Sequence, residues 1–340
     1  MLALGAGVGC GDGLEILLGD VTSQSHIEAG PPPPAGAEDA SFEASGPSSD
    51  APASVPSEQE AEADSPAMAP DAVADSGVFG PATLVTELVD STYINYKETL
   101  TADMLEIYFC SDRPGGPGGP EDIWRSKRAH ATDAWGPVTL VTEVSTASRD
   151  LDPAVAPDGL SLWLSSDRPG GKGAFDIWVS TRASNTAAWS APKDVTELNT
   201  ASDEYPRPPI RSGLAMPPAY REKLPNNQFQ TSLTSRASPT AAWAAPTRLS
   251  DVDTANIDTD GFLTDDELTL YFSSDRVTTN DQDLYVAQRA TPKSAFTSFT
   301  PIAEINTTHQ ERDPWVSADG RDIYFSSDRG GSLQIYHASR

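Results

Sequence analysis

Apolar side chains recur at every second position in short runs of this chain. The leucines at 160, 162 and 164 give the clearest case, and this period of two predicts a β-strand over Leu160–Ser165. A short strand at Asp152–Ala156 precedes it across the tight turn Pro157–Gly159, and strands at Asp176–Ser180 and Val195–Leu198 follow. Four short strands joined by turns predict one antiparallel four-stranded sheet.

The strand that ends in Asp-Arg is written four times. Its copies are Tyr108–Arg113, Trp163–Arg168, Tyr271–Arg276 and Tyr324–Arg329. Their Asp residues, at 112, 167, 275 and 328, are separated by 55, 108 and 53 positions. The middle gap is twice 54, so one copy between them has diverged. A repeat of this length that is rich in short strands predicts a β-propeller.

The phrase that opens each fourth strand occurs five times. It stands at Phe79–Pro81, Trp135–Pro137, Trp189–Pro192, Trp243–Pro246 and Phe299–Pro301. The chain ends on a third strand, Gln334–His337, and residues 79–88 form a fourth strand that lacks the preceding three. We therefore predict an all-β, five-bladed propeller of four-stranded blades over residues 79–340, closed by its N-terminal strand. Closure removes an open sheet edge.

The diverged copy lies at residues 203–236. Prolines interrupt Leu214–Arg221, where the second strand is expected, and proline cannot donate to a strand ladder. Order returns at Gln228–Leu233. Two explanations stay open: a remodelled blade, or a local reading-frame error in the sequence.

The repeat closely resembles the WD40-like (PD40, TolB-like) repeat of bacterial envelope proteins. Residues 317–331 match almost throughout, with an Asp-Gly turn, a Tyr-Phe-Ser-Ser-Asp-Arg strand and a Gly-Gly loop. The resemblance implies a propeller located outside the cytoplasm, in the periplasm, lipid-anchored at the outer membrane, or secreted. It also implies an interaction module whose partner is an envelope protein or a cell-wall glycan.

Composition separates the N-terminal residues from the repeats. Residues 1–78 contain 14 Asp and Glu but no Lys or Arg, and residues 79–340 hold the other 36 acids and all 23 bases. We predict that residues 19–78, rich in Pro, Ala, Ser and acids, form a disordered linker. Residues 1–18 contain an apolar stretch ending in Cys10, which resembles a bacterial lipoprotein signal with Cys10 as the lipidated residue. An unstructured apolar end is the alternative.

The same composition argues against several classes of protein. An acidic chain offers no basic stripe for nucleic acid, no attraction to an anionic membrane surface, and no run of 18 apolar residues. Two cysteines make no disulfide framework, and the four scattered histidines suggest no metal site. We expect a monomer without a cofactor.

The Asp-Arg pairs are predicted to be structural, because a pair repeated in four blades is unlike a reactive group needed once. They are Asp112 and Arg113, Asp167 and Arg168, Asp275 and Arg276, and Asp328 and Arg329. Asp122, Asp176 and Asp283 open the next strands, where they are placed to accept hydrogen bonds from these arginines or from loop N–H groups.

The loops that lead into each innermost strand are the better candidates for a binding site, because they differ between blades and ring the central funnel. The predicted ligand-binding residues of this rim are Asp152, Asp203, Tyr205, Asp258 and Asp313. We predict a non-catalytic binding or scaffold propeller. The alternative is a five-bladed glycoside hydrolase that uses Asp152, Asp203, Asp258 or Asp313. A weaker alternative is calcium binding by the run Asp251–Asp260, which lacks the full set of loop ligands.

Overall fold

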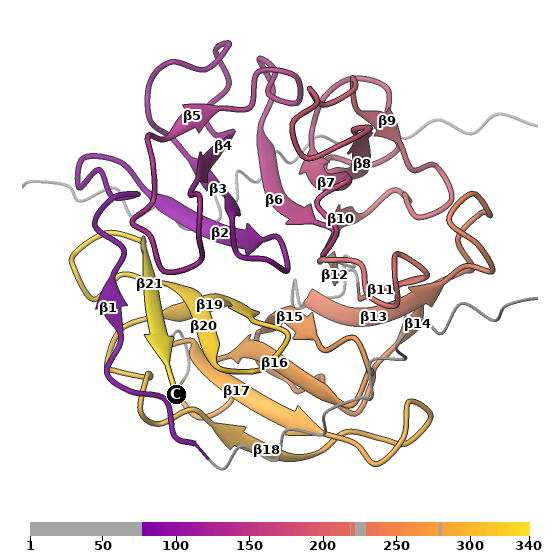
Figure 1. The fold of residues 1–340 in the computed structure, drawn as a ribbon. Coiled ribbons are helices and arrows are strands. Elements are labelled where there is room, and N and C mark those ends of the chain that lie inside the picture. The colour runs from indigo at the N-terminus through magenta and orange to yellow at the C-terminus, as the bar shows by residue number, and fades with distance from the viewer. Residues whose placement is uncertain (1–76, 218, 222–228, 279–280) are drawn as a thin grey trace, which may run out of the picture. The chain divides into compact units, whose positions relative to one another are not determined.

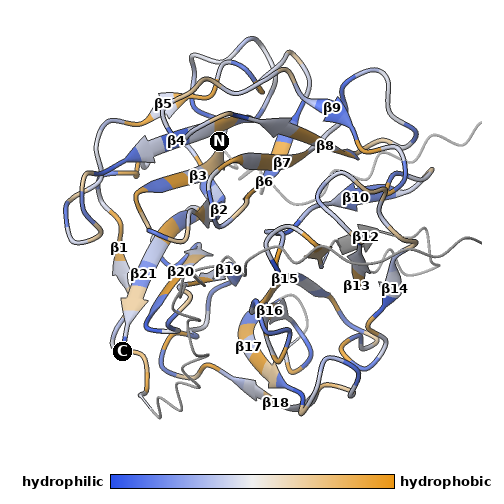
Figure 2. Cartoon of the chain, turned by 45° about the vertical axis from the view of Figure 1, so that its right-hand side comes forward, coloured by the Kyte–Doolittle hydropathy of each residue, from blue (hydrophilic) through white to orange (hydrophobic). Residues whose placement is uncertain are grey.

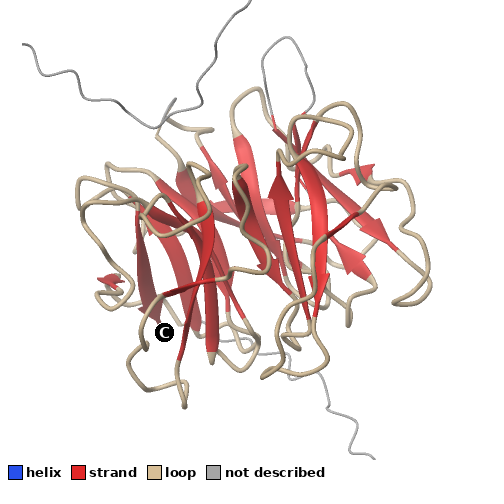
Figure 3. Cartoon of the chain, turned by 90° about the horizontal axis from the view of Figure 1, so that it is seen from above, coloured by secondary structure: helices blue, strands red, loops and turns tan. Residues whose placement is uncertain are grey.

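The computed structural model describes residues 77–340 except 218, 222–228 and 279–280. Cys10 and residues 19–76 of the predicted linker lie outside the described residues. The described part consists of strands and loops (Figure 3). Its strands form five sheets around a common centre (Figure 1), which confirms the predicted five-bladed propeller. Within this part of the chain, no helix is long and apolar enough to cross a membrane.

Three blades follow the predicted order, innermost strand first. The first blade contains β2 (Asn95–Leu100), β3 (Glu106–Ser111), β4 (Asp122–Lys127) and β5 (Thr139–Leu140). The second contains β6 (Asp150–Val155), β7 (Ser161–Ser166), β8 (Asp176–Thr181) and β9 (Lys193–Asp194). The fourth contains β15 (Asp258–Leu263), β16 (Thr269–Ser274), β17 (Asp283–Gln288) and β18 (Thr297–Pro301).

The fifth blade joins the two ends of the described chain. Its inner strands are β19 (Glu311–Val316), β20 (Asp322–Ser327) and β21 (Gln334–Ser339), and its outer strand is β1 (Thr83–Leu84). Thr83 lies opposite His337 in the antiparallel pair, and the Val85 N–H donates to the Ile335 carbonyl at 3.0 Å. The predicted closure by the N-terminal strand is thus confirmed.

The third blade departs from the others because proline interrupts two of its strands. Its innermost strand, β10 (Asp203–Tyr205), ends where Pro206 begins. The second-strand position is divided between β11 (Ala215–Met216) and β12 (Ala219–Arg221), and both pieces pair with β13 (Phe229–Ser235). The outermost strand is β14 (Thr247–Arg248). The early end of β10 brings Arg207 into the centre of the ring.

Apolar side chains fill the space between neighbouring blades. Figure 2 shows apolar residues along β3, β7 and β17. Between the first two blades, the buried Tyr108 and Trp189 rings meet edge to face at a centroid distance of 6.0 Å. Trp163 of the second blade meets Trp243 of the third in the same way, at 5.6 Å. Such contacts stabilise the ring through burial and aromatic packing.

Each Asp-Arg pair ties two loops of its blade together. The Arg168 guanidinium donates to the Ser166 hydroxyl at 2.9 Å, to the Val144 carbonyl at 2.7 Å, and to the Asp150 carboxylate. Equivalent arginine contacts fix Asn95, Asp258 and Glu311 at the starts of the other inner strands. The Asp partners Asp112, Asp167, Asp275 and Asp328 accept N–H bonds from the loops that enter those strands.

The arginine of the repeat does not bind the acid that opens the next strand, which was one of the two predicted options. Arg168 binds Asp150, whereas Asp176 accepts the backbone N–H groups of Lys172 and Gly173. The two acids therefore act separately, each on its own loop. This arrangement holds the beginnings of four of the five inner strands in place, which is where the candidate site is built.

Candidate functional site

One backbone irregularity recurs at the third residue of four inner strands. Each of these residues has a left-handed backbone: Lys97 (φ 58°), Asp152 (φ 47°), Asp260 (φ 56°) and Asp313 (φ 55°). The pairing register shifts at the same place in each of the four strands, which indicates a β-bulge. A left-handed backbone strains a non-glycine residue by about 1–3 kcal/mol, and such strain concentrates at functional sites. In this ring it sends charged side chains toward the central axis.

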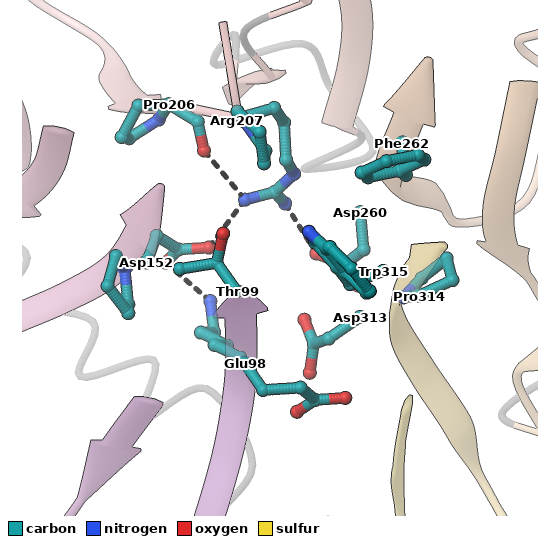
Figure 4. Close-up of a pocket in the computed structure, with 14 residues that line it drawn as sticks. Glu98, Thr99, Asp152, Pro206, Arg207, Asp260, Phe262, Asp313, Pro314 and Trp315 are labelled. Carbon is teal, nitrogen blue, oxygen red and sulfur yellow. Dashed lines mark hydrogen bonds and ion pairs between the residues drawn. The ribbon is translucent and has the colours of Figure 1, made fainter. Parts of the chain in front are cut away.

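These side chains line a cavity at the centre of the ring (Figure 4). All five blades contribute to its wall: Lys97, Glu98 and Thr99 from the first, Asp152 and Pro153 from the second, Pro206, Arg207 and Pro208 from the third, Asp260, Gly261 and Phe262 from the fourth, and Asp313, Pro314 and Trp315 from the fifth. The cavity volume is about 30 Å³, which suits about two water molecules.

Arg207 bridges two of the carboxylates across the cavity. Its Nη1 lies 2.7 Å from Asp152 Oδ1, and its Nη2 lies 2.5 Å from Asp260 Oδ1. Lys97 Nζ lies 2.6 Å from the other oxygen of Asp152. Burial alone would raise the pKa of Asp152, but Lys97 and Arg207 outweigh burial and lower that pKa. Asp152 is therefore held as a carboxylate.

Asp313 has the opposite environment. Its side chain is nearly fully buried, and burial followed by the charge of Asp260 raises its pKa to about 7, although Lys97 acts against the rise. Asp313 Oδ2 has no hydrogen-bond partner among the described residues. The cavity thus contains one carboxylate kept ionised and one carboxylic acid that keeps its proton up to neutral pH.

Glu98 lies beside Asp313 in the cavity (Figure 4). Burial and then the charge of Asp313 raise the pKa of Glu98 well above its ordinary value. The Ser326 hydroxyl donates to Glu98 Oε2 at 2.8 Å, whereas Oε1 has no partner within the described part of the chain. Two cations thus face four acids, and only two of these acids, Asp152 and Asp260, are ion-paired with them.

Aromatic and apolar side chains complete the wall. Trp315 and Phe262 line the cavity, with their ring centroids 6.1 Å apart. Tyr205 lies next to it, with Lys97 Nζ 5.4 Å from the centre of its ring. Aromatic faces of this kind can stack on the apolar face of a sugar ring or attract a cation.

The structure brings only two of the five predicted rim residues, Asp152 and Asp313, into the cavity. Asp258 belongs to the loop-tying contacts, because its carboxylate accepts from Ser274, Thr254 and Arg276. Asp203 accepts from the Phe175 N–H at 3.3 Å in the contact between the second and third blades. Tyr205 is buried between the Phe175 and Phe229 rings.

Four charged residues of the cavity were missing from the predicted rim: Lys97, Glu98, Arg207 and Asp260. A signal for two of them existed, because Lys97 and Asp260 occupy the same repeat position as Asp152 and Asp313. Alignment on that position would have selected Asp260 in place of Asp258.

The four acids of the run Asp251–Asp260 do not form a calcium site. Asp251 accepts from the Phe296 N–H, Asp253 binds Arg248 and Asp260 binds Arg207, while Asp258 is held as described above. Across residues 77–340 with the gaps stated, no group of three or more acidic, histidine or cysteine side chains is arranged to hold a metal ion.

No protein-family model and no curated protein matches the chain. Its structure is similar to an endo-arabinase from Bacteroides thetaiotaomicron, with 12% identity, a TM-score of 0.48, and coverage of 78% of this chain and 98% of that one. It is also similar to the catalytic domain of a Coprinopsis cinerea GH62 α-L-arabinofuranosidase. The identity is 9%, the TM-score is 0.46, and the match covers 74% of this chain and 92% of that one. A Hadza microbial sialidase also matches, with 12% identity and a TM-score of 0.43. This match covers 73% of this chain and 65% of the sialidase.

These matches contradict the predicted function. Glycoside hydrolases predominate among them, whereas the sequence predicted a non-catalytic binding or scaffold propeller that is not an enzyme. We therefore do not retain that prediction, and its enzymatic alternative is taken up as a proposal below. Similarity at this level establishes the propeller fold alone, so the chemistry must be derived from the cavity of this chain.

Proposed function

We propose that this protein is a glycoside hydrolase in which Asp313 is the general acid and Asp152 is the general base or nucleophile. The observation that carries the proposal is the opposite displacement of two carboxyl pKa values in one cavity. Glycoside hydrolysis requires such a pair, because one carboxyl group must donate a proton while the other is ionised.

The roles follow from the surroundings of each group. Asp313 donates its proton to the glycosidic oxygen, so that the leaving sugar departs as an alcohol. Asp152 either accepts a proton from the attacking water or attacks the anomeric carbon itself. In the second case, water deprotonated by Asp313 then cleaves the bond between the sugar and Asp152. Lys97 and Arg207 bind Asp152 and keep it ionised while positive charge develops on the sugar. Trp315 provides an aromatic wall on the side of Asp313.

The size of the cavity limits where the sugar lies. About 30 Å³ accommodates water but no sugar ring, so we place the ring at the mouth of the cavity and the attacking water inside it. Closer approach of the ring requires Arg207 to leave one of its two carboxylates. Arg207 follows the short strand β10 of the irregular blade, so fewer strand contacts restrain its backbone.

The test is release of reducing sugar from a panel of cell-wall and plant polysaccharides. Wild type should act on at least one of them, and Asp313→Asn and Asp152→Asn should each lose at least about 100-fold in kcat/KM. Asp133→Asn, an exposed change of the same chemistry, serves as the control. A folded wild type that cleaves no member of the panel, or an Asp313→Asn variant with full activity, contradicts the proposal.

Membership of the WD40-like repeat family, an extracytoplasmic location and a lipid anchor on Cys10 remain proposals supported by the sequence alone. A cell-wall glycan, one of the two partners expected from the sequence, is then a candidate substrate. Fractionation of cells that express the full chain tests the location separately from the activity.

A further inference from the structure

Glu98 has no role in the hydrolysis described above, yet it is a buried acid in the wall of the cavity. Its residue is 5% exposed, and its Oε1 lacks a partner among the described residues. A buried carboxylate oxygen without a hydrogen-bond partner is costly. Figure 4 shows its carboxyl group directed into the space beside Asp313. An acceptor in this position indicates a ligand that supplies a donor.

The charge balance of the cavity indicates the sign of that ligand. Lys97 and Arg207 are both ion-paired, and their partners are Asp152 and Asp260. Glu98 and Asp313 form no ion pair with either cation, and the charge of Asp313 raises the pKa of Glu98. A positive group placed between them would relieve this repulsion.

The dimensions and walls of the cavity favour an organic ammonium group. An ammonium group is about the size of a water molecule, and the cavity of about 30 Å³ suits about two waters. Trp315 and Phe262 present aromatic surface to a cation. The described residues offer no three-ligand cluster for a metal ion.

We propose that Glu98 binds the primary ammonium group of the substrate, which makes an amino sugar the substrate class of this cavity. The inference rests on the proposed function for the identity of the ligand as a substrate, whereas the binding can be measured without turnover. Glu98 releases its proton to solvent when the ammonium group binds. Asp313 keeps its own proton for the glycosidic oxygen.

The proposal makes binding dependent on pH. The proton and the ammonium group compete for Glu98, so affinity for the amine rises with pH. The groups that face Glu98 are Asp313 and Ser326 of the fifth blade, Asp260 of the fourth, Arg207 of the third, Asp152 of the second, and Lys97 on its own strand. The two cations are already ion-paired with Asp152 and Asp260, so they compete little for Glu98.

The test is calorimetric titration with D-glucosamine and D-glucose between pH 5 and 7, a range in which the amine stays protonated. At pH 7, wild type should bind D-glucosamine at least about tenfold more tightly than D-glucose. This preference should shrink toward pH 5. Titrations in two buffers of different ionisation enthalpy should show release of close to one proton per ligand.

Two isosteric variants assign the effect. Glu98→Gln should lose the preference for the amine, and Asp313→Asn should keep it. Equal affinity for the two sugars, or a preference that survives in Glu98→Gln, overturns the proposal. Calcium chloride that releases protons and displaces D-glucosamine would make this a metal site, which also overturns it. Should Glu98→Gln fail to fold, proton release and the pH dependence in wild type decide the question.

Hydrolysis measurements separate this inference from the proposed function. Binding of D-glucosamine through Glu98 without cleavage of any glycan contradicts the hydrolase and leaves the amine site intact. Cleavage of neutral glycans without a preference for the amine contradicts the amine site and leaves the hydrolase proposal intact. If both hold, tetramers of β-1,4-linked glucosamine should be cleaved at least about tenfold faster than their N-acetylated counterparts.

Discussion

Replacement of Asp313 by Asn should abolish hydrolysis and yet make the protein less sensitive to alkaline pH. Asp313 is nearly fully buried, and its pKa is raised to about 7 from an ordinary value of 3.8. The unfolded chain loses this proton near pH 4, whereas the folded protein keeps it until about pH 7. Stability linked to Asp313 is therefore full below pH 4 and falls as the pH rises to 7. Integrated from pH 5 to pH 8, the loss is about 3 kcal/mol.

Asparagine resembles the protonated acid and does not titrate, so the variant should escape this loss. Urea unfolding of wild type and Asp313→Asn at pH 5 and pH 8 measures the loss of stability that is linked to Asp313. From pH 5 to pH 8, the free energy of unfolding of wild type should fall by about 3 kcal/mol more than that of the variant. Asp133→Asn should track wild type, because that side chain is half exposed. Parallel pH dependence of wild type and Asp313→Asn would refute the assigned environment of Asp313, and with it the general acid.

Three further predictions concern the frame and the N-terminus. Deletion of residues 1–76 should leave the melting temperature unchanged. Deletion of residues 1–88 also removes three buried apolar side chains and should cost about 5–9 kcal/mol of stability. Equal melting temperatures of the two truncated proteins would contradict closure by β1. Arg168→Ala leaves the buried Asp150 without its cation and should cost about 3–5 kcal/mol in urea unfolding; a cost below 1 kcal/mol would contradict a structural role. Cys10→Ser should move the full chain from the detergent phase to the soluble fraction, and unchanged partitioning would contradict lipidation.

The repeat made most of the frame predictable. The fixed spacing of the Asp-Arg strands and the recurring fourth-strand phrase determined both the number of blades and the closure, because each blade buries the same positions against its neighbours. The third blade escaped prediction. Its prolines break the pattern that defines strands elsewhere, and the division into β11 and β12 depends on pairing with β13.

The cavity was predictable only in part. A bulge rotates one residue out of the alternation, so a period of two cannot tell that Asp260 rather than Asp258 faces the axis. Arg207 enters from a segment with no matching repeat, and it reaches its partners on two other blades only in the closed ring. The raised pKa of Asp313 depends on burial and on Asp260, which lies 53 residues earlier in the chain.

The pairing of β1 with β21 also sets an order in time. The hydroxyl of Thr83 donates to the carbonyl of His337, 254 residues later. At ordinary rates of synthesis, that interval is about 10–50 s. During it, β1 has no partner, while the blades between β1 and β21 can form one after another. The synthesis of β21 therefore decides when the ring can close, and long-range pairing of this kind slows folding. A circular permutant that begins at β2 and carries residues 77–88 after Arg340 would remove the wait without changing a single contact of the cavity.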